Sequence, residues 1–114
     1  MLTLLHNPRC SKSRAALALL EARGVAVEIV DYLKAPPSRA ALAALRGKLG
    51  LPASRWVRTG EAEYARAGLG DASTESEILD AMAEHPILIE RPIAIRGARA
   101  VVGRPPERVL ELLD

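Results

Sequence analysis

The chain has 114 residues, 49% of them hydrophobic, and its 16 basic and 14 acidic residues give a formal net charge of +2. This length suits one domain with its own core, and the near balance of charge argues against a protein that binds nucleic acid. Because the chain has no Phe and only 3% aromatic residues, base stacking is not expected, and the core must be built from Leu, Val, Ile and Ala.

Cys10 is the single cysteine, which excludes an internal disulfide and any metal site that needs several cysteines. The apolar start is only a few residues long and no small-residue cleavage site follows it, so no signal peptide is expected. No apolar run approaches the length of a membrane span. We therefore expect a cytoplasmic monomer in reducing surroundings, without a metal, a bound cofactor or a membrane partner.

The first third of the chain predicts a strand, a helix and a second strand. The apolar run Leu2 to Leu5 stops at His6-Asn7-Pro8 and is typical of a buried strand that enters a loop. Residues 11–24 have the spacing of a helix with Gly24 at its C-terminal cap, and the β-branched segment 25–33 predicts another strand. Such a βαβ unit should have parallel strands.

The middle of the chain is expected to be helical. Pro36-Pro37 breaks the chain, Ser38 can cap a helix that carries Leu42, Leu45 and Leu49, and Gly50 can end that helix. Residues 51–71 are less regular and predict short helices around Gly60.

The last third predicts a helix, a hairpin and a closing helix. Thr74 to Glu77 form a capping box of the T-x-x-E kind, and His85-Pro86 should stop that helix. Residues 87–104 are typical of two strands that turn at Arg96-Gly97-Ala98. Pro105-Pro106 opens a final helix with its apolar residues at Val109, Leu110 and Leu113.

Together these elements predict an α/β protein with a four-stranded mixed sheet and packed helices. No repeat, linker or low-complexity segment interrupts the chain, so residues 1–114 are expected to form a single domain. The pattern is compatible with a thioredoxin-like fold but does not by itself distinguish that fold from other small α/β folds.

The segment HNPRCSKSR, His6 to Arg14, places Cys10 where the first strand gives way to the first helix. The free N–H groups of the first helical turn and the helix dipole favour a thiolate there. Arg9, Lys12 and Arg14 add positive charge, and the hydroxyls of Ser11 or Ser13 can donate hydrogen bonds. A lone cysteine is otherwise most often a small buried hydrophobe, but this setting favours an ionised nucleophile.

Ser13 occupies the position where a second cysteine would make a Cys-x-x-Cys dithiol. Cys10 therefore cannot form its own disulfide, and any resolving thiol must come from outside the chain, most simply from glutathione or a partner protein.

Three segments resemble the glutaredoxin-coupled arsenate reductases, the ArsC family. They are the loop at His6 to Arg14, the segment HPILIERPI at His85 to Ile93, and GRPPE at Gly103 to Glu107 before the final helix. The stretch Tyr32 to Leu42 also fits. The resemblance runs over essentially the whole chain in order.

The resemblance implies a thioredoxin-like fold with a helical insertion and a catalytic Cys10. It also implies three arginines around a substrate oxyanion, which map by position to Arg58, Arg91 and Arg104. In the family scheme the thiolate attacks arsenate, glutathione displaces the adduct to a mixed disulfide, glutaredoxin reduces that disulfide, and arsenite leaves. Glutathione is thus a co-substrate, and arsenate, glutathione and glutaredoxin are the implied partners.

Two further positions take roles from the resemblance. Pro92 resembles the cis-proline that thioredoxin-like folds place beside the active cysteine, so we predict a cis Arg91–Pro92 bond. The position of His6 implies a residue that tunes the thiolate, although a structural histidine at the end of a strand is an equal alternative. We assign no chemical role to His85.

The chain departs from many established family members at Ser11-Lys12, where they carry Gly-Thr. It also ends at Asp114, a few residues past its last apolar turn, which indicates a short branch of the family. Two other functions therefore stay open. One is thiol transfer on glutathione mixed disulfides through the same Cys10, and the other is non-enzymatic regulation by binding a protein.

Overall fold

The computed structural model describes residues 1–113 and divides into two compact units. The sheet unit comprises Met1–Ala35 and the described part of Arg91–Asp114, and the helical unit is Pro36–Glu90. Asp114, the last residue of the predicted 1–114 domain, lies outside the described residues. The expectation of a single domain stays a prediction.

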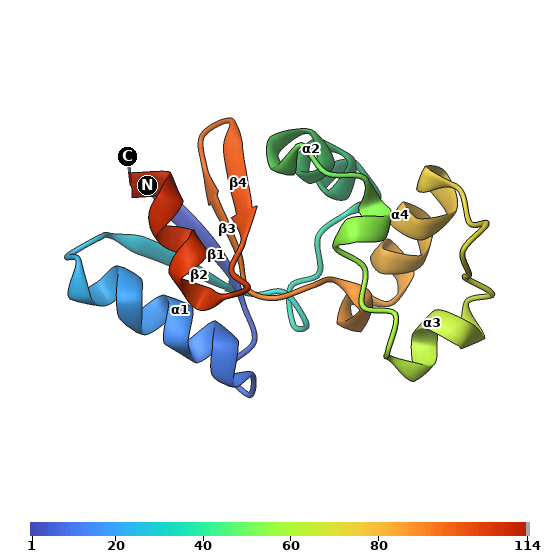
Figure 1. Cartoon of the computed structure of the whole chain (residues 1–114), viewed down its shortest axis with the longest axis horizontal. Helices are drawn as coiled ribbons and strands as arrows, with labels where there is room; N and C mark the ends of the chain where they lie inside the picture. Colours follow the sequence, from blue (N-terminus) through green and yellow to red (C-terminus); the bar gives the residue numbers. More distant parts are fainter. Residues whose placement is uncertain (114) are drawn as a thin grey trace. The chain divides into compact units, whose positions relative to one another are not determined.

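The sheet unit contains four strands in the order β2-β1-β3-β4 (Figure 1). They are β1 (Leu2–His6), β2 (Val27–Asp31), β3 (Ile93–Arg96) and β4 (Arg99–Val102). β1 pairs with β2 in parallel and with β3 antiparallel, and β3 pairs antiparallel with β4. The predicted four-stranded mixed sheet and the parallel βαβ unit are both confirmed.

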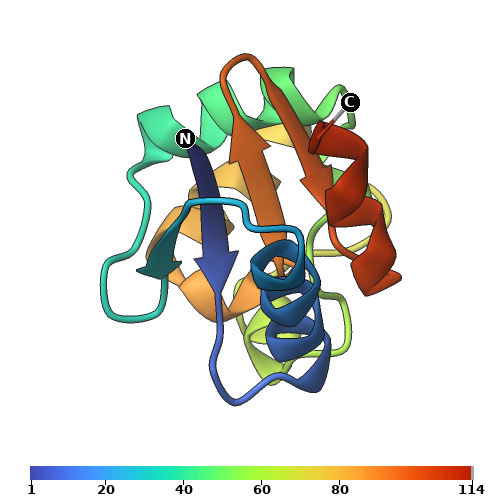
Figure 2. The same ribbon diagram turned by 90° about the vertical axis from the view of Figure 1, so that its left-hand side faces the viewer.

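Helix α1 (Ser11–Ala22) and the 3₁₀ helix η3 (Pro106–Leu113) cover the same face of this sheet (Figure 2). Successive residues of a strand point to opposite faces of the sheet. Every second residue of β1 and β3 can therefore face the core beneath the helices. This core consists of Leu2, Leu4, Ala16, Leu20, Ala94, Val109 and Leu112. Its aliphatic composition agrees with the expectation from a sequence without Phe.

The C-terminus of α1 shows why the helix ends where the sequence predicts. Gly24 has a φ of 69°, which a residue without Cβ adopts at little cost. Its N–H donates to the Glu21 carbonyl at 3.0 Å, and the Val25 N–H donates to the Leu20 carbonyl at 3.2 Å. These two bonds satisfy carbonyls that the helix leaves free and direct the chain toward β2.

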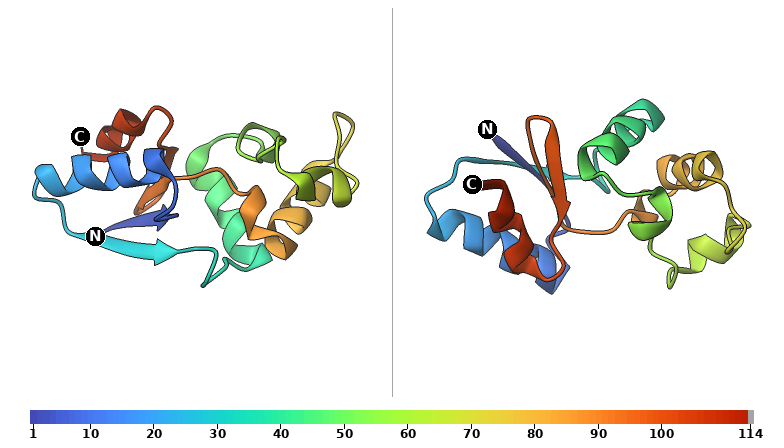
Figure 3. Two further views of the ribbon diagram at one scale, coloured as in Figure 1. Left: turned by 90° about the horizontal axis from the view of Figure 1, so that it is seen from below. Right: turned by 45° about the horizontal axis from the view of Figure 1, so that its top comes forward.

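The helical unit contains α2 (Arg39–Leu49), α3 (Ala62–Arg66) and α4 (Glu75–Glu84), with short 3₁₀ helices η1 (Ala53–Arg55) and η2 (Pro86–Leu88) (Figure 3). Its predicted caps are all present. The Ser38 hydroxyl accepts the Ala41 N–H, Gly50 ends α2 in the left-handed region, and Thr74 and Glu77 form the reciprocal capping box. Among residues 1–113, no helix combines the length and apolarity that crossing a membrane requires.

Three expectations about secondary structure need correction. The segment 87–92 is not a strand, because it forms η2 and then a single bridge from Ile89 to Val57 within the helical unit. The second strand is shorter than the predicted 25–33 and covers only Val27–Asp31. The final helix is 3₁₀, and its buried residues are Val109 and Leu112, with Leu110 and Leu113 partly buried.

Candidate active site

Cys10 is the N-cap residue of α1, as the sequence predicts, and a tight turn holds it there. The Cys10 N–H donates to the Asn7 carbonyl at 3.0 Å, and the Arg9 N–H donates to Asn7 Oδ1 at 3.0 Å. The Cys10 carbonyl in turn accepts the Arg14 N–H at 3.0 Å, which starts the helix. The backbone on both sides of the half-buried thiol is therefore fixed by hydrogen bonds.

The surroundings of the sulfur lower the pKa of Cys10 below its ordinary value. Burial alone would raise that pKa, because it disfavours the charged form. The backbone N–H of Ser13, the Arg91 guanidinium and the backbone N–H of Lys12 outweigh burial, since each stabilises the thiolate by a hydrogen bond. The first turn of α1 thus acts on the sulfur through its free backbone donors.

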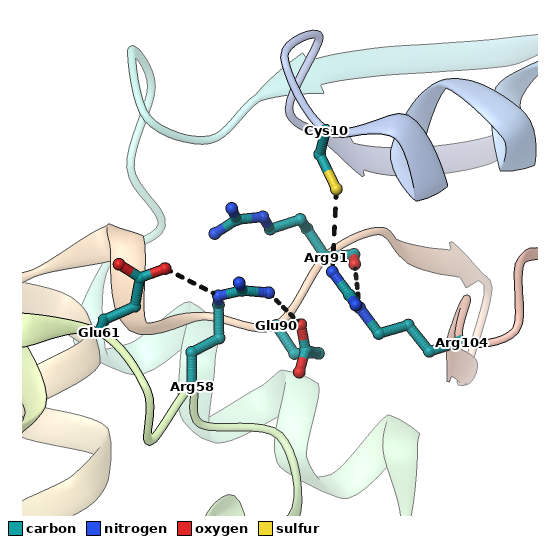
Figure 4. Close-up of polar contacts among 6 residues, drawn as sticks. All are labelled: Cys10, Arg58, Glu61, Glu90, Arg91 and Arg104. Atoms are coloured by element: carbon teal, nitrogen blue, oxygen red, sulfur yellow. Dashed lines mark hydrogen bonds and ion pairs between the residues drawn. The ribbon is translucent and has the colours of Figure 1, made fainter.

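Arg104 brings a second guanidinium to the sulfur (Figure 4). Its Nη2 lies 3.8 Å from Cys10 Sγ, and its Nε donates to the Arg91 carbonyl at 2.9 Å. The backbone of one arginine therefore anchors the side chain of the other. Two of the three arginines predicted to hold an oxyanion lie beside the predicted nucleophile, within the sheet unit.

The chain around Arg91 and Arg104 is shaped by Pro92 and Gly103. The Arg91–Pro92 bond is cis, as predicted, and the Arg104–Pro105 bond, for which no cis isomer was predicted, is cis too. The Gly103 N–H donates to the Pro92 carbonyl at 2.8 Å. A Cβ on Gly103 would lie 2.7 Å from Pro92 Cγ and 3.0 Å from Val109 Cγ1, so only glycine fits this close approach without a shift.

Ser13 is fully buried, and its hydroxyl serves the loop, with only its backbone N–H acting on the sulfur. Its Oγ accepts the Asn7 N–H at 3.0 Å and lies 2.8 Å from His6 Nδ1. The prediction that the hydroxyl could donate to the thiolate is therefore corrected. We assign its proton to His6 Nδ1, the arrangement in which the imidazole is neutral and carries its own proton on Nε2.

Burial lowers the pKa of His6, and the positive charge of Arg14 lowers it further, while the Asp31 carboxylate acts in the opposite direction. The net shift favours the neutral ring, which agrees with a Ser13 hydroxyl that donates to Nδ1. His6 thus helps to hold the buried Ser13 in place, and its predicted role in tuning the thiolate stays a prediction.

In the helical unit, Arg58 is held by two carboxylates. Its Nε pairs with Glu61 Oε1 at 3.1 Å, and its Nη1 pairs with Glu90 Oε1 at 2.7 Å. Its N–H donates to the Leu88 carbonyl at 2.7 Å, next to the Val57–Ile89 bridge. Burial acts to lower the pKa of Arg58, but the charges and hydrogen bonds of Glu90 and Glu61 outweigh it and raise the pKa.

The model of the ArsC family matches residues 5–112, which covers both units and every residue of this site. The chain belongs to the ArsC family.

The ArsC-family chain is similar to the following proteins over nearly its whole length. It is 46% identical over 112 residues to an arsenate reductase of Neisseria meningitidis serogroup A, with 96% of each chain covered. It is 44% identical over 110 residues to the uncharacterized protein YfgD of Escherichia coli K12, with 95% of this chain and 92% of the relative covered. The solved arsenate reductase of Vibrio cholerae matches with a TM-score of 0.92 and 46% identity, over 96% of this chain and 95% of that one. This likeness confirms the thioredoxin-like fold.

Within the sheet unit, the structure of the ArsC-family chain brings several of the predicted site residues together. Cys10, Arg91 and Arg104 lie together, with Ser13 and Lys12 acting through backbone N–H groups. Arg14 donates from Nη1 to the Pro8 carbonyl at 2.9 Å and so braces the loop, and Ser11 is exposed at the start of α1. Arg58 belongs to the helical unit, so its predicted role as an oxyanion ligand stays a prediction.

Asn7 also belongs to the site, although it was not among the predicted site residues. Asn7 is buried and contributes three groups to the loop: its carbonyl to Cys10, its Oδ1 to Arg9, and its N–H to Ser13 Oγ. The signal was present in the sequence, because an Asn before a Pro often closes such a turn with its side chain. Within residues 1–113, no group of three His, Cys, Asp or Glu side chains could hold a metal ion.

Proposed function

We propose that this chain is an arsenate reductase that reduces arsenate to arsenite with Cys10 as the nucleophile. The observation that carries the proposal is a half-buried cysteine with a lowered pKa at a helix N-terminus, flanked by Arg91 and by Arg104 at 3.8 Å. Relatives that cover the same length and are named arsenate reductase support the choice of oxyanion.

The first step joins two anions, and the arginines lower its barrier. The Cys10 thiolate attacks the As(V) centre of arsenate, an S–As bond forms, and one arsenate oxygen leaves as water after protonation. Arg91 and Arg104 supply planar donors whose geometry matches the oxyanion and whose charge offsets the repulsion between thiolate and substrate. Because Arg104 is anchored on the Arg91 carbonyl, these donors need little reorganisation when charge develops.

The second step requires thiols from outside the chain, because Cys10 is the only cysteine. A glutathione thiolate attacks Cys10 Sγ, an S–S bond forms, and the electron pair of the S–As bond stays on arsenic, which leaves as arsenite. Glutaredoxin then reduces the resulting mixed disulfide and returns Cys10 to its thiolate. We propose glutathione as co-substrate, glutaredoxin as protein partner, and the cytoplasm as the compartment that keeps both reduced.

Arg58 is proposed as the third oxyanion ligand, on the strength of its position in the sequence. Its guanidinium is already paired with Glu61 and Glu90, so it would contribute while sharing its charge with two carboxylates. His6, Ser11, Lys12, Ser13 and Arg14 are proposed to keep the loop and its thiolate in place.

A coupled assay with arsenate, glutathione, glutaredoxin, glutathione reductase and NADPH tests the proposal. We expect arsenate-dependent NADPH oxidation with the wild type and none above background with Cys10→Ser, which keeps the size of the side chain. Equal rates for the two proteins would overturn the reductase proposal.

A parallel assay with a glutathione mixed disulfide in place of arsenate addresses the alternative of thiol transfer, which the single Cys10 also permits. We expect the rate of NADPH oxidation in the arsenate assay to be higher than the rate in the same assay without arsenate. Turnover that needs Cys10 and the mixed disulfide, and does not respond to arsenate, would assign the chain to thiol transfer.

A further inference from the structure

Two exposed cations flank Cys10 and have no side-chain partner among residues 1–113. Arg9 immediately precedes the cysteine and Lys12 follows it by two residues, and both are exposed. The structure gives neither side chain a hydrogen bond or an ion pair in the described part of the chain. Arg14, the third cation of this loop, is instead turned to the Pro8 carbonyl.

The backbone that carries these two cations is fixed. Arg9 sits within the turn closed by the Cys10 N–H on the Asn7 carbonyl, and its own N–H is held by Asn7 Oδ1. Lys12 lies in the first turn of α1, and its backbone N–H acts on the sulfur. Both residues are therefore held within two positions of Cys10 in the chain, and both side chains are exposed to solvent.

The interactions that the structure gives the Cys10 sulfur do not involve the side-chain charges of Arg9 and Lys12. Arg91 and Arg104 are the guanidiniums that act on the sulfur, and the Lys12 contribution to the thiolate comes from its backbone. The Asp31 carboxylate acts on His6, at the start of this loop. Arg9 and Lys12 are thus exposed cations within two positions of Cys10 in the chain, on the loop that a reaction partner of the thiolate must approach.

We propose that Arg9 and Lys12 select the thiol partner of Cys10 by charge and favour small thiols and disulfides that carry carboxylates, the class to which glutathione belongs. This inference deepens the proposed function and rests on Cys10 as its nucleophile. Electrostatic attraction raises the rate of encounter with an anion and lowers it with a cation, over a range set by the Debye length of about 10 Å at 0.1 M salt.

The test measures attack of the Cys10 thiolate on three disulfides of different charge: anionic oxidised glutathione, neutral hydroxyethyl disulfide and dicationic cystamine. In each reaction the S–S bond of the reagent breaks, Cys10 forms a mixed disulfide, and the electron pair leaves on the released thiolate. Mass spectrometry of the protein gives the second-order rate constants. Dividing each by the rate constant of a small free thiol removes the intrinsic reactivity of the reagent.

The variant Arg9→Ala/Lys12→Ala is compared with Arg23→Ala/Lys48→Ala, which removes the same charge outside the active-site loop. Arg23 is exposed at the far end of the 12-residue helix α1, about 18 Å from its start, and Lys48 is exposed in the helical unit. The ratio of anionic to neutral rate constants cancels any change in the thiolate pKa, because that change affects both reactions equally.

We expect the first variant to lower the anionic-to-neutral ratio about four- to tenfold and to raise the cationic-to-neutral ratio, with both effects weaker at 1 M salt. The control variant should leave both ratios within about twofold of the wild type. Unchanged ratios in the first variant, or an equal change in the control, would overturn the proposal. No reaction here contains arsenate, so the result is independent of the reductase assay.

Discussion

The hydroxyl and the backbone N–H of Ser13 have different partners. The buried hydroxyl contacts Asn7 and His6 and does not contact the sulfur, whereas the backbone N–H stabilises the Cys10 thiolate. Ser13 Oγ joins the Asn7 N–H to His6 Nδ1, which fixes the end of β1 against the first turn of α1. Its N–H is then aimed at Cys10. Position along the chain predicted that Ser13 matters, but only the fold could show which of its groups faces the sulfur.

Arg91→Ala should raise the pKa of Cys10, because the hydrogen bond and charge of Arg91 both favour the thiolate. The same change should weaken protection of Cys10 by sulfate against alkylation by about 10- to 100-fold, as expected for the loss of charge-assisted bonds. The pH profile of iodoacetamide alkylation, with and without sulfate, measures both effects.

Arg108→Ala provides the matched control, since Arg108 is an exposed arginine of the same unit that pairs with Glu111 at 3.2 Å. It should leave the alkylation profile and the sulfate protection unchanged. Identical behaviour of the two variants would show that Arg91 acts only as general positive charge.

His6 should make the folded state less stable in acid. Its pKa is lowered by burial, so the unfolded chain takes up a proton at a higher pH than the folded protein does. The contribution of a neutral His6 is therefore fully present above its unfolded pKa of about 6.5, and it is lost as the pH falls through the lower folded value.

His6→Asn keeps an acceptor for the Ser13 hydroxyl and removes the titration. Urea denaturation should give a stability advantage of the wild type over this variant that is larger at pH 7.5 than at pH 5. Other titrating groups cancel in the difference. An advantage that is the same at both pH values would contradict the assignment of a neutral, buried His6.

The ends of the helices could be predicted from local sequence, whereas the pairing of the strands depends on tertiary packing. Ser38, Gly24, Gly50 and the Thr74–Glu77 box act on backbone groups a few residues away, so the sequence alone located them. The segment 87–92 has the apolar composition of a strand, yet its only bridge partner among residues 1–113 is Val57. Composition cannot reveal which distant backbone is available for pairing.

Gly103 connects β4 to the site, and replacing it with alanine should disturb both. The added Cβ would meet the ring of Pro92 at 2.7 Å, and a proline ring cannot swing aside as the end of a flexible side chain would. We expect Gly103→Ala to cost about 1–3 kcal/mol, the usual range for overpacking, in urea denaturation.

Gly47→Ala is the matched control for this substitution. Gly47 lies inside helix α2, and a Cβ there meets nothing within 4 Å. It should stabilise the protein by about 0.5–1 kcal/mol, because alanine loses less backbone entropy in a helix than glycine does. Equal effects of the two substitutions would mean that the contact of Gly103 with Pro92 is not close.

At the scale of the whole molecule, the site joins the first strand-to-helix loop with two arginines more than 80 residues further along the chain. The sheet places them together, because β1 pairs with β3 and β3 with β4, so the residues around Arg91 and Arg104 meet the end of β1. No local pattern predicts that meeting. The proximity of Cys10, Arg91 and Arg104 could be predicted only from the resemblance of three separate segments to one family.

The pH dependence of Cys10 alkylation by iodoacetamide tests the central claim most directly, because Cys10 is the only thiol in the chain and the reagent is neutral. We expect an apparent pKa clearly below about 8.5, the value of a free cysteine, with the reactivity falling as the pH drops through that lower value. An apparent pKa at or above about 8.5 would contradict the activated thiolate on which the proposed chemistry depends.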